Sequence, residues 1–393
     1  MVSINEFCKM LEKDRQCNFV ALAITYLQAN SIDATIKYLQ AKGVEINGYI
    51  LIASHKVTGM LLDESMFLCR DNPNIKFIEF DYTSTEKFGS FQKISNKLSI
   101  FFDSKKKSKN DIYIAWIDID MYWVGMLKNI TPKKVTYILL DDGGGSYANK
   151  YDDIVHLIQY GNNGKKNGLK VRLKKIKVYL NCLFRDIIIN RMKKTNRIIW
   201  STIFHKVYEN GSYKLVPNSD LTPFYVDTLG ETGKALDERD INVLYDSALF
   251  NTQCLVENKI TDGVIDYELY KKCSLILKKH SIDVVIKPHP REMNKIRYNE
   301  IADFVYEGNG YSQEVLLARG EKKPKCIISI FSSTLLNAYG LFGIKAISLA
   351  KIVLREEISE GFREQLSEFI ELYGDLFFFP ETLEEFENMV KEL

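Results

Sequence analysis

The 393-residue sequence predicts an α/β protein made of two Rossmann-like domains, and three observations support this fold class. Short apolar runs rich in β-branched residues alternate with segments of helical periodicity, as they do in βαβ units. The runs are apolar throughout, which is typical of strands buried on both faces of a parallel sheet. The chain is also too long for one ordinary core, because domains commonly hold about 100–150 residues.

The first half of the chain shows the alternation most clearly. Residues 18–25 are predicted to form a strand, and the helix that follows is predicted at 31–40, with Asn30 or Ser31 as its cap and Gly43 ending it. Further strands are predicted at 49–53, 75–80, 112–117 and 135–140.

The second half repeats the pattern. The predicted strands are 243–250, 284–286, 327–331 and 344–349, and the predicted helices are 267–279, 312–318 and 382–391. Between the halves, residues 198–238 contain scattered Gly, Pro and Ser without sustained periodicity, which is typical of a linker. We therefore expect an N-terminal domain at 1–235 and a C-terminal domain at 239–393, facing a shared cleft.

Composition predicts a soluble cytoplasmic protein. The chain is 46% hydrophobic and 26% charged, as globular proteins are. Its seven cysteines are an odd number without paired spacing, which favours a reducing compartment. Residues 1–16 lack the apolar core of a signal peptide, and no early apolar run approaches the roughly 20 residues that cross a bilayer.

One segment departs from the near-neutral balance of the chain. Between Lys165 and Arg197 there are twelve Lys or Arg and one acid, Asp186, although the whole chain carries only +2. Such a segment can hold a protein against anionic lipid, and it is equally typical of a solvated helix face. Nucleic acid is less favoured as a partner, because no stacking aromatic pattern or recognised binding motif accompanies the charge.

Three short motifs each follow one of the apolar runs. They are Asp141-Asp142-Gly143, Lys287-Pro288-His289-Pro290 and Ser332-Ser333-Thr334. In open α/β sheets, ligands bind beyond the carboxyl ends of the strands. The motifs therefore place acids, an imidazole with a cation, and paired hydroxyls at the sheet edges where a nucleotide-sugar could bind.

His289 is the strongest candidate for catalysis. An imidazolium can neutralise or protonate a departing phosphate near neutral pH. Pro288 and Pro290 stiffen the backbone around it, and Lys287 adds positive charge. The alternative is a structural histidine in the turn after a strand.

The hydroxyl motif precedes a predicted helix. Ser332, Ser333 and Thr334 can join backbone N–H groups in holding phosphate oxygens, although residues of this kind also serve simply as N-caps. Glu314 has a carboxylate that can hold both ribose hydroxyls of a nucleotide, with a solvated helix surface as the alternative.

Acids supply the candidates for a general base. Asp141 or Asp142, on a backbone made pliable by Gly143, can take the proton of an acceptor hydroxyl. A metal site has weak support from two adjacent acids, and a plain acidic turn is the remaining alternative. Glu257 follows another apolar run and could reach the cleft from the second domain, although alone it is unremarkable.

The ordered set of these motifs resembles the bacterial sialyltransferases with a GT-B fold. The stretch between His289 and Ser332 is short, as in the lipooligosaccharide sialyltransferase family, a glycosyltransferase family 52-like group, whereas the polysialyltransferases separate these motifs more widely. Residues 25–28, 202–204 and 311–317 extend the resemblance. It implies a GT-B fold and an inverting transfer of sialic acid from CMP-sialic acid to a terminal galactose of a bacterial surface glycan, either lipooligosaccharide or capsule. No cofactor and no metal are implied.

The same resemblance implies roles in donor binding. His289 would be the acid that serves the departing phosphate, Ser332 and Ser333 would hold that phosphate, and Glu314 would hold the ribose. Lys287, Pro290 and Thr334 complete the expected donor site in the second domain.

The acceptor would bind the first domain, where Gln28, Asp142 and Gly143 are expected to contact sugar. Related sialyltransferases imply Asp141 as the base. The closest family instead uses an acid near the start of the second domain, where this chain lacks a clear Ser-Pro-Asp sequence and Glu257 is the nearest substitute.

Other activities stay open. The chain could be a polysialyl-, Kdo- or glycerophosphate-type transferase that uses another CMP- or CDP-linked donor, or a noncatalytic GT-B scaffold of a surface-glycan assembly complex. A homodimer and peripheral association with the cytoplasmic face of the inner membrane are further expectations.

Overall fold

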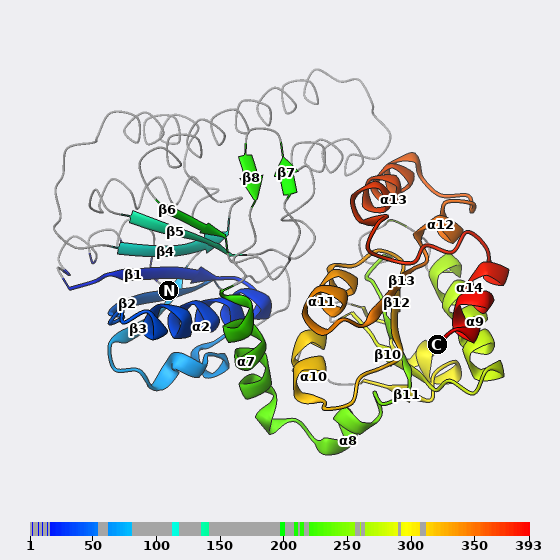
Figure 1. The fold of residues 1–393 in the computed structure, drawn as a ribbon, viewed down its shortest axis with the longest axis horizontal. Helices are drawn as coiled ribbons and strands as arrows, with labels where there is room; N and C mark the ends of the chain where they lie inside the picture. Colours follow the sequence, from blue (N-terminus) through cyan, green and yellow to red (C-terminus); the bar gives the residue numbers. More distant parts are fainter. Residues whose placement is uncertain are drawn as a thin grey trace. The chain divides into compact units, whose positions relative to one another are not determined.

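The computed structural model describes residues 2, 7, 10, 14, 16–53, 62–80, 112–117, 135–140, 197–200, 208–210, 213–215, 220–255, 260, 264–289, 292–306 and 312–393. The described residues up to Thr228 form one compact unit, and those from Leu229 onward form a second (Figure 1).

The first unit contains a six-stranded sheet whose neighbouring strands are all parallel, in the order β3-β2-β1-β4-β5-β6. The strands are β1 (Phe19–Ala23), β2 (Gly48–Ala53), β3 (Ile75–Phe80), β4 (Ile112–Ile117), β5 (Val135–Leu140) and β6 (Arg197–Trp200). This is the doubly wound order of a Rossmann fold, which reverses between its first and fourth strands.

Shorter elements complete this unit. They are α2 (Tyr26–Ala41), the 3₁₀ turns η1 (Glu64–Met66) and η2 (Leu68–Asp71), the antiparallel pair β7 (Tyr208–Asn210) and β8 (Tyr213–Leu215), and α7 (Thr222–Thr232), which crosses into the second unit. Every residue of β1 is fully buried, as expected of a central strand covered on both faces.

The start of α2 corrects the sequence prediction. Its cap is Thr25, whose hydroxyl accepts a hydrogen bond from Gln28 N, so the helix begins five residues before Ser31 was expected to cap it. Ser31 instead lies inside the helix, and its hydroxyl donates to Leu27 O at 2.8 Å. Serine can satisfy itself in this way within a helix as well as at a cap, so residue type alone did not place the boundary.

The second unit contains a five-stranded parallel sheet in the order β11-β10-β9-β12-β13. The strands are β9 (Ala248–Asn251), β10 (Val284–Lys287), β11 (Phe304–Val305), β12 (Cys326–Ser329) and β13 (Lys345–Ser348). The helices and 3₁₀ turns are η5 (Gly233–Ala235), α8 (Glu238–Asn242), α9 (Val264–Lys279), η6 (Ile296–Glu300), α10 (Gln313–Arg319), α11 (Ser333–Phe342), α12 (Ala350–Val353), α13 (Glu360–Tyr373) and α14 (Leu383–Lys391). The strand order again reverses between the first and fourth strands of the unit, here β9 and β12.

Helices cover this second sheet on both faces, with α10 and α11 on one side and α9 and α14 on the other (Figure 1). Phe250 of β9 packs edge-on against Tyr270 of α9, with ring centroids 5.5 Å apart. The predicted C-terminal helix is present as α14. It is joined to α9 through Phe386, which is fully buried in the core, and through Glu387, whose carboxylate lies 2.6 Å from Lys279 Nζ.

The predicted start of one strand in the second unit was also wrong. The strand expected at 243–250 begins only at Ala248, because α8 and a turn with Asp246 at φ 58° occupy the residues before it. The segment predicted as a linker, 198–238, contains β7, β8, α7, η5 and most of β6, so it has more regular structure than its sequence indicates. Short strands and a helix of modest amphipathicity carry too little periodicity to be recognised among Gly and Pro.

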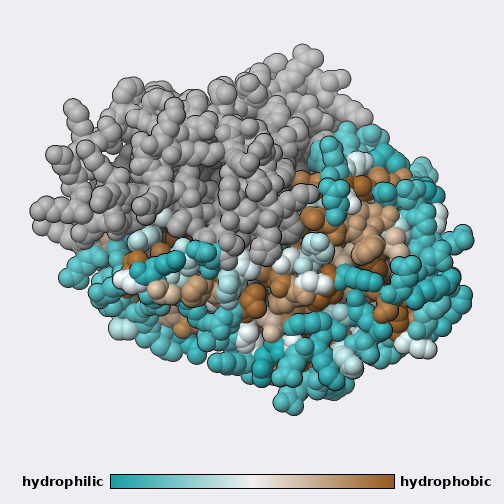
Figure 2. Space-filling model, in the orientation of Figure 1, coloured by the Kyte–Doolittle hydropathy of each residue, from teal (hydrophilic) through white to brown (hydrophobic). Residues whose placement is uncertain are grey.

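The predicted fold class, α/β with two Rossmann-like parallel sheets, is confirmed. A GT-B fold consists of two Rossmann-like domains, and each of the two units has that architecture. No helix in the described ranges is long and apolar enough to span a membrane. Figure 2 shows mostly hydrophilic residues along the margins of the described surface, with apolar residues grouped over the C-terminal unit.

Candidate functional site

The carboxyl ends of three neighbouring strands in the second unit carry most of the predicted donor-site residues that the structure describes. Lys287, the last residue of β10, pairs with Asn251, the last residue of β9. On the other side of β9, Ile328 of β12 pairs with Phe250. The chain therefore leaves β9, β10 and β12 at one edge, next to the point where the strand order reverses, and this is where open α/β sheets bind ligands.

Hydrogen bonds join the end of β12 and the loop after it to the end of β9 and the loop after it. Ser329 Oγ donates to Asn251 O at 2.7 Å, and Phe331 N donates to Gln253 Oε1 at 3.2 Å. The backbone that leads into Ser332 is thus held against the central strand of the sheet.

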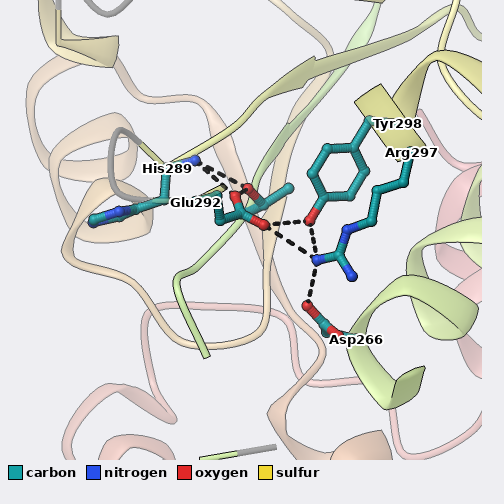
Figure 3. Close-up of polar contacts among 6 residues, drawn as sticks. Asp266, His289, Glu292, Arg297 and Tyr298 are labelled. Carbon is teal, nitrogen blue, oxygen red and sulfur yellow. Dashed lines mark hydrogen bonds and ion pairs between the residues drawn. The ribbon is translucent and has the colours of Figure 1, made fainter. Parts of the chain in front are cut away.

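His289 lies two residues beyond β10, and its main chain is firmly held. Its N–H donates to Thr252 Oγ1 at 3.0 Å and to Glu292 Oε2 at 2.9 Å, while its carbonyl accepts from Glu292 N at 3.0 Å. The imidazole points away from these partners (Figure 3). His289 is therefore fixed through its backbone, with the ring directed elsewhere.

Behind His289 lies a buried cluster of charged and hydroxyl groups. Glu292 Oε1 accepts from Tyr298 Oη at 2.6 Å and from Arg297 Nη2 at 3.2 Å, and Arg297 Nη2 also lies 3.1 Å from Asp266 Oδ2 (Figure 3). Glu292 and Asp266 are only 5% and 1% exposed. Burial raises the pKa of Glu292, and hydrogen bonds from Thr252 and Tyr298 oppose that shift.

Lys287, Glu314 and Asn337 form a second polar group of this unit. Lys287 is buried, which lowers the pKa of its ammonium, and the carboxylate of Glu314 opposes the shift. Glu314 itself is 5% exposed, and its Oε1 accepts from Asn337 Nδ2 at 2.7 Å. The structure therefore places Glu314 among buried groups, and the solvated helix surface considered as an alternative is wrong for this residue.

The hydroxyl motif forms the start of α11. Ser332 is the N-cap, and its Oγ accepts a hydrogen bond from Thr334 N at 3.3 Å. The same Oγ lies 2.9 Å from Thr334 Oγ1. Ser333 is half-buried beside them. Capping and ligand binding are compatible here, because a helix N-terminus supplies N–H groups and a positive dipole to an anion while hydroxyls at the same turn can donate to it.

Gln28 is the one predicted sugar-binding residue that the structure describes in the first unit. It is 1% exposed, and its Oε1 accepts from Ile24 N at 2.8 Å, so that it closes the turn between β1 and α2. Asp141, Asp142, Gly143, Glu257 and Pro290 lie outside the described residues.

Sequence reasoning missed Glu292, Thr252 and Asn337. One signal for Glu292 was available: it follows His289 by three residues, the spacing at which a glutamate in a capping box reaches back to a main-chain N–H. Thr252 and Asn337 carry no such signal, because their partners are distant in the sequence. Within the described residues, no group of three His, Cys, Asp or Glu is placed to hold a metal ion.

A model of a known protein family covers this site. The model for alpha-2,8-polysialyltransferase (POLYST) matches residues 128–351, which is more than half of the chain and includes every predicted site residue except Gln28. The chain belongs to the alpha-2,8-polysialyltransferase family. It is therefore a glycosyltransferase of the sialyltransferase type, as the motifs predicted. The narrower resemblance to lipooligosaccharide sialyltransferases stays a prediction.

Solved structures that resemble this polysialyltransferase-family chain include two sialyltransferases. An alpha/beta-galactoside alpha-2,3-sialyltransferase from Photobacterium phosphoreum is 12% identical, covers 90% of this chain and 95% of its own, and has a TM-score of 0.47. A sialyltransferase GT-B domain from Photobacterium damselae is 14% identical, with coverage of 92% and 98% and a TM-score of 0.41.

An enzyme of another kind is about as similar. The UDP-GlcNAc 2-epimerase from Neisseria meningitidis is 13% identical, with coverage of 95% and 93% and a TM-score of 0.45. With TM-scores below 0.5, these likenesses carry no argument about this chain. Among curated proteins, no sequence matches the chain.

Proposed function

We propose that the chain is an inverting sialyltransferase that uses CMP-sialic acid as its donor and needs neither a cofactor nor a metal. The observation that carries this proposal is the shared strand edge of the second unit, where Lys287 ends β10, His289 lies two residues beyond it and Ser332 follows β12. The family match covers all three residues.

The groups at this edge suit the departure of a nucleotide monophosphate. As the bond from the anomeric carbon to the phosphate oxygen breaks, negative charge collects on that phosphate. His289 gives the departing phosphate a proton, and the buried cation of Lys287 adds positive potential. The hydroxyls of Ser332 and Ser333 and the N-terminus of α11 hold phosphate oxygens, with Thr334 beside them, while Glu314 binds the ribose hydroxyls.

Bond formation takes place on the opposite face of the sugar, which inverts the anomeric configuration. The acceptor hydroxyl oxygen bonds to the anomeric carbon, and its proton passes to a carboxylate base, either Asp141 or Glu257. Pro290 shapes the donor site, and Gln28, Asp142 and Gly143 belong to the acceptor side. Because the anomeric carbon is tertiary and forms an oxocarbenium-like centre, stabilisation of the leaving group carries much of the rate.

The acceptor has two candidates. The motifs led us to a terminal galactose of a bacterial surface glycan, and the family description adds a second acceptor, a chain that already ends in sialic acid and grows through α2,8 linkages. If the assay with CMP-sialic acid fails, the alternatives are a transferase that uses a donor carrying Kdo or glycerophosphate, and a noncatalytic scaffold. We also propose a cytoplasmic location, with the basic segment at 165–197 available for anionic lipid, and a homodimer, with no nucleic-acid partner.

The test is the release of CMP from CMP-sialic acid in EDTA, measured with lactose, with a sialic-acid-terminated oligosaccharide, and without acceptor. We expect acceptor-stimulated, EDTA-resistant release that falls about 10²- to 10³-fold in a folded His289→Ala variant. The better acceptor distinguishes single transfer to galactose from polymerisation. Full activity in His289→Ala would overturn the proposed role of the imidazole, and no release with any acceptor would overturn the proposed donor.

A further inference from the structure

His289 lies between two prolines, and this limits how its backbone can be held. Proline has no N–H, so among residues 288–290 only His289 offers a main-chain donor. That one N–H is shared by two buried acceptors, Thr252 Oγ1 at 3.0 Å and Glu292 Oε2 at 2.9 Å. Thr252 and Glu292 are 4% and 5% exposed, so water does not compete for this hydrogen bond.

The two acceptors are also bonded to each other, since Thr252 Oγ1 donates to Glu292 Oε2. Thr252 directly follows β9, and Glu292 lies in the loop after β10. The hydrogen bonds among Thr252, Glu292 and His289 N therefore join the His289 loop to the end of β9, the central strand of the sheet.

The other oxygen of the Glu292 carboxylate is anchored separately. Oε1 accepts from Tyr298 and Arg297, and Arg297 in turn meets Asp266 of α9 (Figure 3). A buried carboxylate loses much hydration energy, which raises the pKa of Glu292, and its four hydrogen-bond donors together with the nearby charge of Arg297 oppose that shift. Oε1 of Glu292 thus faces Tyr298 and Arg297, and Oε2 faces the His289 N–H.

We propose that Glu292 and Thr252 are positioning residues that hold the backbone of His289 so that its imidazole meets the departing phosphate of the donor. This inference rests on the proposed function, because it gives Glu292 and Thr252 a role only through His289. Small displacements of a reacting group are costly, and a shift of about 1 Å can lower a rate about 10²-fold.

Glu292→Gln is the direct test. The amide has one oxygen where the carboxylate has two, so it can accept either from His289 N or from Tyr298 and Arg297, but not from both sides. Its NH₂ group then faces a hydrogen-bond donor on the side that lost its acceptor. We expect kcat to fall about 10- to 100-fold with the KM for the donor little changed, because CMP-binding groups such as Glu314 and Ser332 are untouched.

Thr252 provides a second, gentler pair of variants. Thr252→Val keeps the shape and removes the hydroxyl, whereas Thr252→Ser keeps the hydroxyl. We expect kcat to fall in the valine variant and to recover in the serine variant. This pair keeps the test decisive if Glu292→Gln does not fold.

Tyr298→Phe is the matched control for loss of stability. It removes two buried hydrogen bonds, one that Tyr298 Oη donates to the other oxygen of the same carboxylate and one that it accepts from Arg297 Nη2. Both acceptors of the His289 N–H stay in place. We expect a loss of thermal stability with less than about a 3-fold effect on kcat. If Tyr298→Phe and Glu292→Gln lower kcat in proportion to their losses of stability, the cluster is only structural and the inference is wrong.

A double-variant comparison separates this inference from the proposed function. If Glu292 acts through His289, Glu292→Gln lowers CMP release in the native background and has no further effect in His289→Ala. An equal effect in both backgrounds, or no effect of Glu292→Gln and Thr252→Val on kcat, would overturn the positioning role while leaving the acid role of His289 intact. Full activity of His289→Ala would instead overturn the acid role of His289, and no CMP release with any acceptor would overturn the proposed donor.

Discussion

Glu314→Gln should abolish the preference of the protein for a nucleotide with an intact ribose. Glu314 Oε1 accepts from Asn337 Nδ2 at 2.7 Å, so a glutamine that keeps its oxygen toward Asn337 must present an NH₂ where the other carboxylate oxygen stood. An acceptor for a ribose hydroxyl thereby becomes a donor. Because a hydrogen bond to a charged group contributes about 1.5–3 kcal/mol, CMP should bind about 10- to 100-fold more weakly.

Calorimetric titration of CMP and of 2′,3′-dideoxy-CMP measures this effect. The native protein should prefer CMP, and Glu314→Gln should bind the two ligands nearly equally. Glu314 also opposes the lowered pKa of the buried Lys287, but that change acts through the phosphate, which both ligands carry. Asn337→Ala should act in the same direction with a smaller effect. A folded Glu314→Gln variant that keeps the full preference for CMP would refute the ribose role.

Three further predictions concern stability and reactivity. Hydrogen bonds from Lys279 and His280 lower the pKa of Glu387 from 4.5 to about 2, so its stabilisation of α14 on α9 is present above about pH 4.5 and is lost as the pH falls toward 2. The free energies of unfolding of Glu387→Gln and the native protein, measured by chemical denaturation, should differ at pH 7 and converge near pH 2. A difference that stays constant with pH would contradict this prediction. A Cβ on Gly48 would stand 1.8 Å from Phe19 O, so Gly48→Ala should show no cooperative thermal transition by circular dichroism. The control, Gly230→Ala, has nothing within 4 Å of its Cβ and should unfold cooperatively. A stable Gly48→Ala variant would show that β1 and β2 do not pair in this register. Burial raises the pKa of Cys326 to about 12, so peptide mapping should find no iodoacetamide adduct there at pH 8 until denaturant is added, and labelling in the native state would be the contrary result.

Local chemistry explains why so much of the fold was predictable. Strands β1, β5, β10 and β12 are mostly apolar, as expected of strands in a parallel sheet that helices cover, and that pattern is visible in the sequence itself. Once the strands are known to be parallel, the motifs that follow β10 and β12 must reach the same edge. The place of His289, Ser332 and Ser333 at this edge was therefore predictable from the sequence, and their roles in catalysis and donor binding stay predictions.

Tertiary structure decided the groups that support those residues. Thr252 meets His289 because β9 pairs with β10 in one register, and Asn337 meets Glu314 because α10 packs on α11. Hydrogen bonds of this kind join residues far apart in the chain, so no local pattern records them. The charge state and orientation of a buried carboxylate depend on which donors surround it, and only packing brings those donors together.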